Sequence, residues 1–143
     1  PLPYLWDDGD QAQGAFSICL ETALITRKME EAGDPPFRLG QGRTTSMYWT
    51  VSQMIAHHTV GGCNLRSGDL LGTGTISTPD HSGLGSLMEL SEGGANPVIL
   101  PNGEVRRFLE DGDCLIISGR AQSPGFREIG FGPCRGRIEQ ALP

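Results

Sequence analysis

The sequence lacks an apolar run long enough to cross a membrane, and it does not open with a basic stretch followed by an apolar one. A membrane span needs about 20 consecutive, mostly apolar residues, and a secretory leader needs that basic-then-apolar order. We therefore expect a cytoplasmic protein with no membrane partner. The first residue is Pro1 rather than methionine, so we also expect the chain to be a piece of a longer one.

Basic residues are scarce relative to acidic ones. The chain has 11 lysines and arginines against 17 aspartates and glutamates, which gives a net charge of -6. Proteins that bind nucleic acid need a basic face, whereas acidic and basic residues are interspersed here. The charge pattern therefore argues against a nucleic-acid partner.

The cysteines lack the spacing that a metal site would need. Cys19, Cys63, Cys114 and Cys134 lie far apart, with no C-x-x-C motif, so the signature of a structural zinc site is absent. By count alone, four cysteines also allow a disulfide framework. Because nothing else indicates secretion, we interpret them as reduced thiols, and we assign no metal ligand in this chain.

Turn-forming residues are abundant. The chain has 143 residues, enough for one domain with a sizeable core, and its 21 glycines and 10 prolines favour short strands over long helices. Residues 27–37 are predicted to be a charged loop or the end of a hairpin, and the strongest hairpin signal is Pro101-Asn102-Gly103-Glu104. Eight strands are predicted, over residues 15–25, 70–76, 86–90, 97–100, 105–109, 114–119, 126–129 and 136–138. The predicted fold class is α+β, mostly β, with mixed or antiparallel sheets of short strands and one main helix.

The one main helix is predicted over residues 45–60, capped by Thr45 or Ser46 and stopped by two glycines. It carries two adjacent histidines, His57 and His58, which suggest a metal site. Adjacent helical positions point about 100° apart, so two such imidazoles do not readily share one ion. Packing, or a favourable interaction with the helix C-terminus, is the interpretation we favour.

The strongest local indication of function lies in residues 63–90. Two apolar segments there flank a loop rich in glycine, serine, proline and aspartate. Thr75 lies beside Gly72 and Gly74 in the first segment, and Glu89 lies between two apolar residues in the second. Alternation along a strand predicts that Glu89 points to the face opposite those two neighbours. Glycines within a strand are unfavourable unless a backbone or a ligand approaches closely. A hydroxyl and a carboxylate beside such a backbone predict a small-molecule site, although a β-bulge and a solvent-facing glutamate would also explain them.

Several segments resemble the fumarylacetoacetase (fumarylacetoacetate hydrolase) family. The resemblance spans nearly the whole chain, is weakest over residues 30–43, and indicates that residues 1–143 are the C-terminal portion of the family's catalytic domain. The matching segments, in order, are PLPYL, MYWTVSQMIAHHTVGGCNLRSGDLLGTGTIS, GSLMEL, FLEDGD and IGFGPCRGRI.

The resemblance implies a cytoplasmic, homodimeric hydrolase that cleaves a carbon–carbon bond in the diketo acid 4-fumarylacetoacetate, giving fumarate and acetoacetate. By position, Glu89 is the candidate catalytic residue, similar to the glutamate that orients the family's water-activating histidine. Thr75 is similar to a threonine that contacts the substrate. The complete enzyme is expected to use a divalent cation, Mg²⁺ or Ca²⁺. That cation's ligands, the catalytic histidine and a carbanion-stabilising lysine are expected upstream of this chain.

Two alternatives remain open. One is a hydrolase of the same fold that acts on acylpyruvate-type diketones. The other is a non-catalytic β-domain that serves only oligomerisation or ligand binding. The long matching segment around the double histidine favours the fumarylacetoacetase interpretation over the first alternative, and a divalent-cation titration of this chain would test the second.

Overall fold

The computed structural model describes residues 2–142, so Pro1 and Pro143, at the two ends of the predicted domain, lie outside the described residues. Within that range the chain forms four α-helices and six strands. The helices are α1 (Asp8–Gln13), α2 (Arg27–Ala32), α3 (Val51–Val60) and α4 (Leu87–Leu90). The strands are β1 (Ile18–Ile25), β2 (Phe37–Arg43), β3 (Val98–Ile99), β4 (Val105–Arg106), β5 (Cys114–Ala121) and β6 (Ile129–Arg137). The predicted α+β class is confirmed, with α3 the longest helix.

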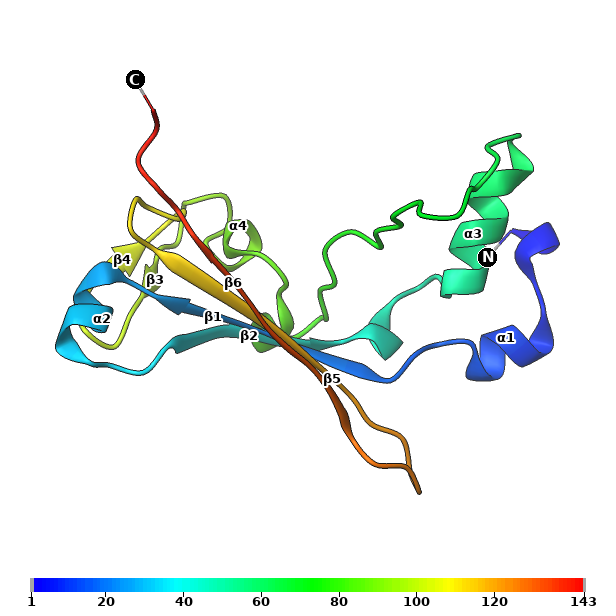
Figure 1. Ribbon diagram of the computed structural model, residues 1–143, viewed down its shortest axis with the longest axis horizontal. Helices are drawn as coiled ribbons and strands as arrows, with labels where there is room; N and C mark the ends of the chain where they lie inside the picture. Colours follow the sequence, from blue (N-terminus) through cyan, green and yellow to red (C-terminus); the bar gives the residue numbers. More distant parts are fainter. Residues whose placement is uncertain (1, 143) are drawn as a thin grey trace.

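A four-stranded sheet forms the centre of the molecule (Figure 1), with the strand order β2-β1-β5-β6 and every neighbouring pair antiparallel. Strands β3 and β4 form a separate two-stranded hairpin. Helices α2 and α4 gather with this hairpin at one end of the sheet, whereas α1 and α3 lie at the other end (Figure 1). Among residues 2–142, no helix is both long and apolar enough to cross a bilayer.

The hydrophobic core lies at the end of the sheet that carries α2, α4 and the hairpin. Leu24 in β1 and Leu90 in α4 belong to it, with 0% and 6% of their surface exposed. Leu90 and the half-buried Leu87 both pack on this core, so helix α4 is held there while Met88 and Glu89 are exposed. The complete set of buried members is Leu24, Ile25, Met29, Leu39, Leu90, Leu100 and Cys114.

Helix α3 is attached to the N-terminal segment of the chain. It begins after Thr50, which forms a reciprocal capping pair with Gln53 and donates its hydroxyl to Asp10 at 2.5 Å. The buried Gln53 amide donates to the carbonyl of Leu5 at 3.2 Å. The predicted helix start at residue 45 is therefore wrong: Thr44–Ser46 is a separate 3₁₀ turn, and the stronger cap selects Thr50.

Several strand predictions are confirmed. Strand β1 occupies most of residues 15–25, β5 begins at Cys114 as predicted, and the β3–β4 hairpin turns through residues 101–104. The hairpin is closed by the Leu100 N–H, which donates to the Glu104 carbonyl at 2.8 Å. The final strand, β6, is longer than the sequence predicted because it pairs along nearly the whole of β5.

Further secondary-structure predictions are wrong. Of the strand predicted over residues 126–129, only Ile129 belongs to β6, and the sequence did not predict strand β2. Residues 27–37 include helix α2, which Thr26 caps through its hydroxyl, rather than only a loop. Residues 70–76 are not a strand: they run as an extended segment without a pairing strand, and Leu70 is 97% exposed. Residues 86–90 form the start and turn of α4 rather than a strand, because the Ser86 hydroxyl caps the Glu89 N–H.

Candidate functional site

Glu89 lies in α4, on an exposed turn next to the core residue Leu90. The alternation that predicted its orientation on a strand does not apply, since α4 is helical. Its carboxylate nevertheless has defined partners. The Ser86 hydroxyl donates to Oε2 at 2.8 Å, and the Ser77 hydroxyl lies 2.8 Å from Oε1 and 2.9 Å from Oε2.

These hydrogen bonds determine the electrostatics of the carboxylate. The hydroxyls of Ser86 and Ser77 hold the pKa of Glu89 below its ordinary value, because both stabilise the charged form. Partial burial acts in the opposite direction and is outweighed. Glu89 is therefore an ionised hydrogen-bond acceptor at neutral pH, which is the state needed to hold a protonated imidazole or an imidazole N–H.

The two serines come from opposite ends of one tight loop, residues 77–86. The loop is closed by the Thr78 N–H, which donates to the Gly83 carbonyl at 3.0 Å, and by the Gly85 N–H, which donates to the Ser77 hydroxyl at 3.1 Å. Gly85 approaches the preceding segment so closely that a Cβ there would lie 2.7 Å from Cγ2 of Thr75 and nearer still to the Ile76 carbonyl oxygen. Only glycine fits at this point.

Thr75 is exposed and lies on the extended segment just before this loop. It lines a hollow of about 270 Å³ together with Ser77, Trp49 and Met54. Ser77 therefore faces both this hollow and the Glu89 carboxylate. The structure brings Thr75 and Glu89 to the two sides of one closed loop, while the roles assigned to them stay predictions.

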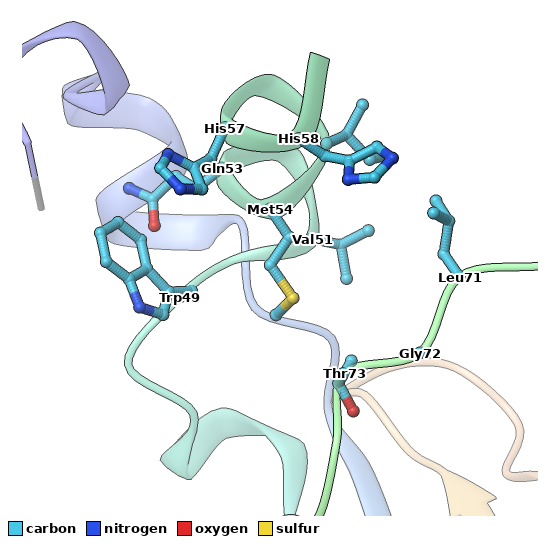
Figure 2. A pocket seen from close by; sticks show the side chains of 10 residues that line it. Trp49, Val51, Gln53, Met54, His57, His58, Leu71, Gly72 and Thr73 are labelled. Carbon is cyan, nitrogen blue, oxygen red and sulfur yellow. The ribbon is translucent and has the colours of Figure 1, made fainter. Parts of the chain in front are cut away.

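A larger cavity of about 400 Å³ adjoins this hollow, between α3 and residues 71–73. Figure 2 shows its lining: Met54 extends from α3 toward Thr73, and Trp49 forms one side. The rings of His57 and His58 lie on different sides of α3 (Figure 2). His57 stacks on Tyr4, and its Nδ1 lies 2.6 Å from the Tyr4 hydroxyl. For His57, the structure thus supports the packing interpretation.

The sequence of this chain matches a known protein family and several named proteins. Residues 37–139 match the family model described as "Fumarylacetoacetate (FAA) hydrolase C-terminal". The chain is 45% identical to the human fumarylacetoacetase over 142 residues, which are 99% of this chain and 32% of that protein. It is 42% identical to the Dictyostelium discoideum fumarylacetoacetase over 96% of this chain and 31% of that protein. The Caenorhabditis elegans fumarylacetoacetase is 53% identical over 92 residues, 64% of this chain and 22% of the relative.

The chain belongs to the fumarylacetoacetate hydrolase family. The family match includes the 77–86 loop, Thr75 and Glu89, so the candidate site lies within the shared region. The match also includes all of β2, residues 37–43, although the sequence resemblance is weakest over residues 30–43. The chain spans about a third of the length of the curated relatives that it matches.

A divalent cation of the kind implied by the fumarylacetoacetate hydrolase resemblance does not fit the described residues. Among residues 2–142 there is no group of three or more His, Cys, Asp or Glu side chains that could hold a metal ion. The acidic residue at the candidate site, Glu89, is bound by the Ser77 and Ser86 hydroxyls instead. We therefore derive no chemical step through a cation from this chain.

A second charged cluster has a structural role. The Arg106 guanidinium forms two hydrogen bonds to Asp113, at 2.8 and 3.0 Å, and both side chains are buried. Asp113 raises the pKa of Arg106, and Glu104 and Glu110 add to the effect. The cluster ties the β3–β4 hairpin to the start of β5, within the core end of the sheet, and faces neither cavity described above.

The sequence interpretation missed the role of Ser77 and Ser86. The spacing Ser86-x-x-Glu89 is the signature of a helix N-cap with an acidic third residue, and it could have identified α4 and this contact. No sequence pattern predicts the contact between Ser77 and Glu89, because the two residues are 12 positions apart and meet only when the loop closes.

Proposed function

We propose that this chain is the C-terminal part of the catalytic domain of a fumarylacetoacetase, with residues 1–143 forming that part. The proposed reaction adds water across a carbon–carbon bond of 4-fumarylacetoacetate and releases fumarate and acetoacetate. The observation that carries the proposal is the match of nearly the whole chain to proteins that all bear this name. The loop that fixes Glu89 supports it.

In the proposed reaction, Glu89 accepts a hydrogen bond from the imidazole of a histidine that activates water. A carboxylate in this position fixes the imidazole tautomer and stabilises the imidazolium that forms when the ring takes a proton. The Glu89 carboxylate is suited to this task because its pKa is lowered by the Ser86 and Ser77 hydroxyls, so it stays ionised when the histidine titrates. The histidine itself would come from outside this chain.

Thr75 is proposed to donate its hydroxyl to the substrate. Its position at the edge of the 270 Å³ hollow leaves the side chain exposed and able to reach a diketo acid there. In the complete enzyme, a divalent cation, Mg²⁺ or Ca²⁺, would be held by residues outside this chain. The cytoplasm is the compartment that we propose, since the four free thiols suit a reducing environment.

A homodimer is also proposed. The described surface exposes many large apolar side chains, among them Leu70 at 97% and Phe126 at 79%, and a partner subunit would cover part of this surface. Analytical ultracentrifugation at tens of micromolar would contradict the dimer if it showed a well-folded monomer.

The test of the proposed reaction is a chimera in which this chain replaces the matching third of the human fumarylacetoacetase. The chimera should hydrolyse fumarylacetoacetate, whereas the 143-residue chain alone should be no faster than buffer containing magnesium, because the base and the cation ligands are proposed to lie outside this chain. A folded chimera without this activity would overturn the proposal. Faster hydrolysis of an acylpyruvate than of fumarylacetoacetate would favour the related diketone hydrolase instead.

A further inference from the structure

The Ser77 hydroxyl is held between one donor and one acceptor. It accepts the Gly85 N–H at 3.1 Å, and it lies within 2.9 Å of both carboxylate oxygens of Glu89. A serine hydroxyl has a single hydrogen. Because the Gly85 N–H occupies the oxygen as an acceptor, that hydrogen is directed at the carboxylate, and rotation of the Ser77 side chain to another rotamer would break both contacts.

We propose that Ser77 is a positioning residue that fixes the carboxylate of Glu89 in the orientation required by the reacting histidine. This inference rests on the proposed function. It assigns a role to Ser77 that is distinct from substrate contact and from proton transfer: the side chain acts only through Glu89.

Ser86 also contacts Glu89, but its position has a simpler explanation. Ser86 is the N-cap of α4, and its hydroxyl accepts the Glu89 N–H at 3.2 Å, which is the usual role of a serine at the start of a helix. Ser77 caps no helix and lies 12 residues from Glu89. Of the two hydroxyls, only that of Ser77 is brought to the carboxylate by the fold of the loop rather than by local helix geometry.

The loop couples this contact to the proposed substrate side of the site. Ser77 lines the same hollow as Thr75, and Gly85, which donates to Ser77, lies against the Thr75 side chain. One backbone loop therefore sets the position of both proposed functional groups. A rigid support of this kind is what a site needs when its groups must be placed to a fraction of an ångström.

A loop serine could instead serve folding alone. The two roles differ in what they change. Loss of a positioning contact lowers kcat and leaves KM nearly unchanged, because Ser77 makes no proposed contact with substrate. It also raises the pKa of Glu89, because a hydroxyl donor that favours the carboxylate is gone. Loss of a folding contact alone changes the amount of active protein but neither the pH dependence nor the titration of Glu89.

The experiment compares three variants of the chimera described above: Ser77→Ala, Ser77→Thr and Ser82→Ala. Ser82 is exposed in the same loop and does not bond to Glu89, so it is the matched control. Active-site support contacts of this kind contribute about 10- to 100-fold to activity. We expect Ser77→Ala to lower kcat by that factor with KM within about twofold, and to move the acid limb of the kcat profile to higher pH. Ser77→Thr, which keeps the hydroxyl, should recover most of the loss, and Ser82→Ala should match the parent.

A second measurement uses the 143-residue chain itself and needs no activity. The side-chain carbonyl carbon of Glu89 is titrated by ¹³C NMR in the parent, in Ser77→Ala and in Ser82→Ala. The pKa of Glu89 should rise only in Ser77→Ala. An unchanged titration, or a Ser77→Ala chimera with parental kcat while Glu89→Gln has lost activity, would overturn the inference. An inactive parental chimera would count against the proposed function alone, and the titration would still decide whether Ser77 fixes the carboxylate.

Discussion

Gly85→Ala should destabilise the chain through the closest backbone approach at the candidate site. The added Cβ would lie 2.7 Å from Cγ2 of Thr75 and nearer still to the Ile76 carbonyl oxygen. Carbon atoms in contact are normally about 3.5–4.0 Å apart, so the two segments would have to separate by roughly 1 Å. Overpacking of this kind costs about 1–3 kcal/mol in free energy of unfolding. For a chain of this size, that is a fall of roughly 3–10 °C in Tm.

The assay is thermal unfolding followed by far-UV circular dichroism, with Gly72→Ala as the control. Gly72 lies on the same extended segment, and a Cβ there would have no atom within 4 Å among the described residues. Its backbone is not left-handed, so alanine should be neutral or stabilise by up to about 1 kcal/mol. Equal Tm values for Gly85→Ala and the parent would refute the close approach, and with it the loop geometry that joins Thr75 to Glu89.

Two further predictions concern the charged groups of the fold. Arg106→Met should lower the free energy of unfolding by about 3–5 kcal/mol in urea titrations, because Asp113, which is 1% exposed, loses its partner. The control is Arg38→Met, which removes an exposed ion pair with Glu21, the two side chains being 62% and 36% exposed. It should change the free energy of unfolding by less than about 1 kcal/mol. Similar losses for both variants would contradict this. The Thr26 hydroxyl, followed by Asn102 and Arg106, holds the pKa of Glu104 below its ordinary value. The stability that this shift contributes is present above the unfolded-state pKa of Glu104 and is lost as the pH falls through its folded-state pKa. Tm should therefore fall on acidification, and it should fall less in Glu104→Gln. Identical profiles of Tm against pH for the parent and Glu104→Gln would argue against the linkage.

The sequence predicted the fold where local and long-range preferences agree. Strand β1 alternates apolar and polar residues and is paired on both sides, and the hairpin around residues 101–104 has its own turn signal. The class, the hairpin and the main helix could therefore be predicted. The error at residues 70–76 has a different origin: an apolar run with alternating small residues is typical of a strand, but a strand also needs a partner, and the sequence does not indicate one.

The candidate site was predicted in part. The stretch containing Thr75 and Glu89 was singled out from the glycines beside Thr75 and from its isolated carboxylate. A Cβ at Gly72 or Gly74 would meet no atom within 4 Å among the described residues, so the predicted close approach is wrong at those two positions; it occurs at Gly85 instead. The orientation of Glu89 was not predictable from alternation, because the Ser86 cap turns residues 87–90 into a helix. The Ser77 contact depends on closure of the loop and is visible only in three dimensions.

The central claim is that the Glu89 carboxylate is part of the catalytic arrangement of a fumarylacetoacetase. The most direct test is kcat for fumarylacetoacetate in the chimera, measured for the parent, for Glu89→Gln and for Glu92→Gln. Glu92 is an exposed neighbour that contacts Asn96 instead of the 77–86 loop, so its substitution should leave kcat unchanged. Glu89→Gln should lower kcat by at least about 100-fold, because the amide cannot hold and stabilise an imidazolium as a carboxylate does. A Glu89→Gln chimera with kcat within about twofold of the parent would contradict the claim.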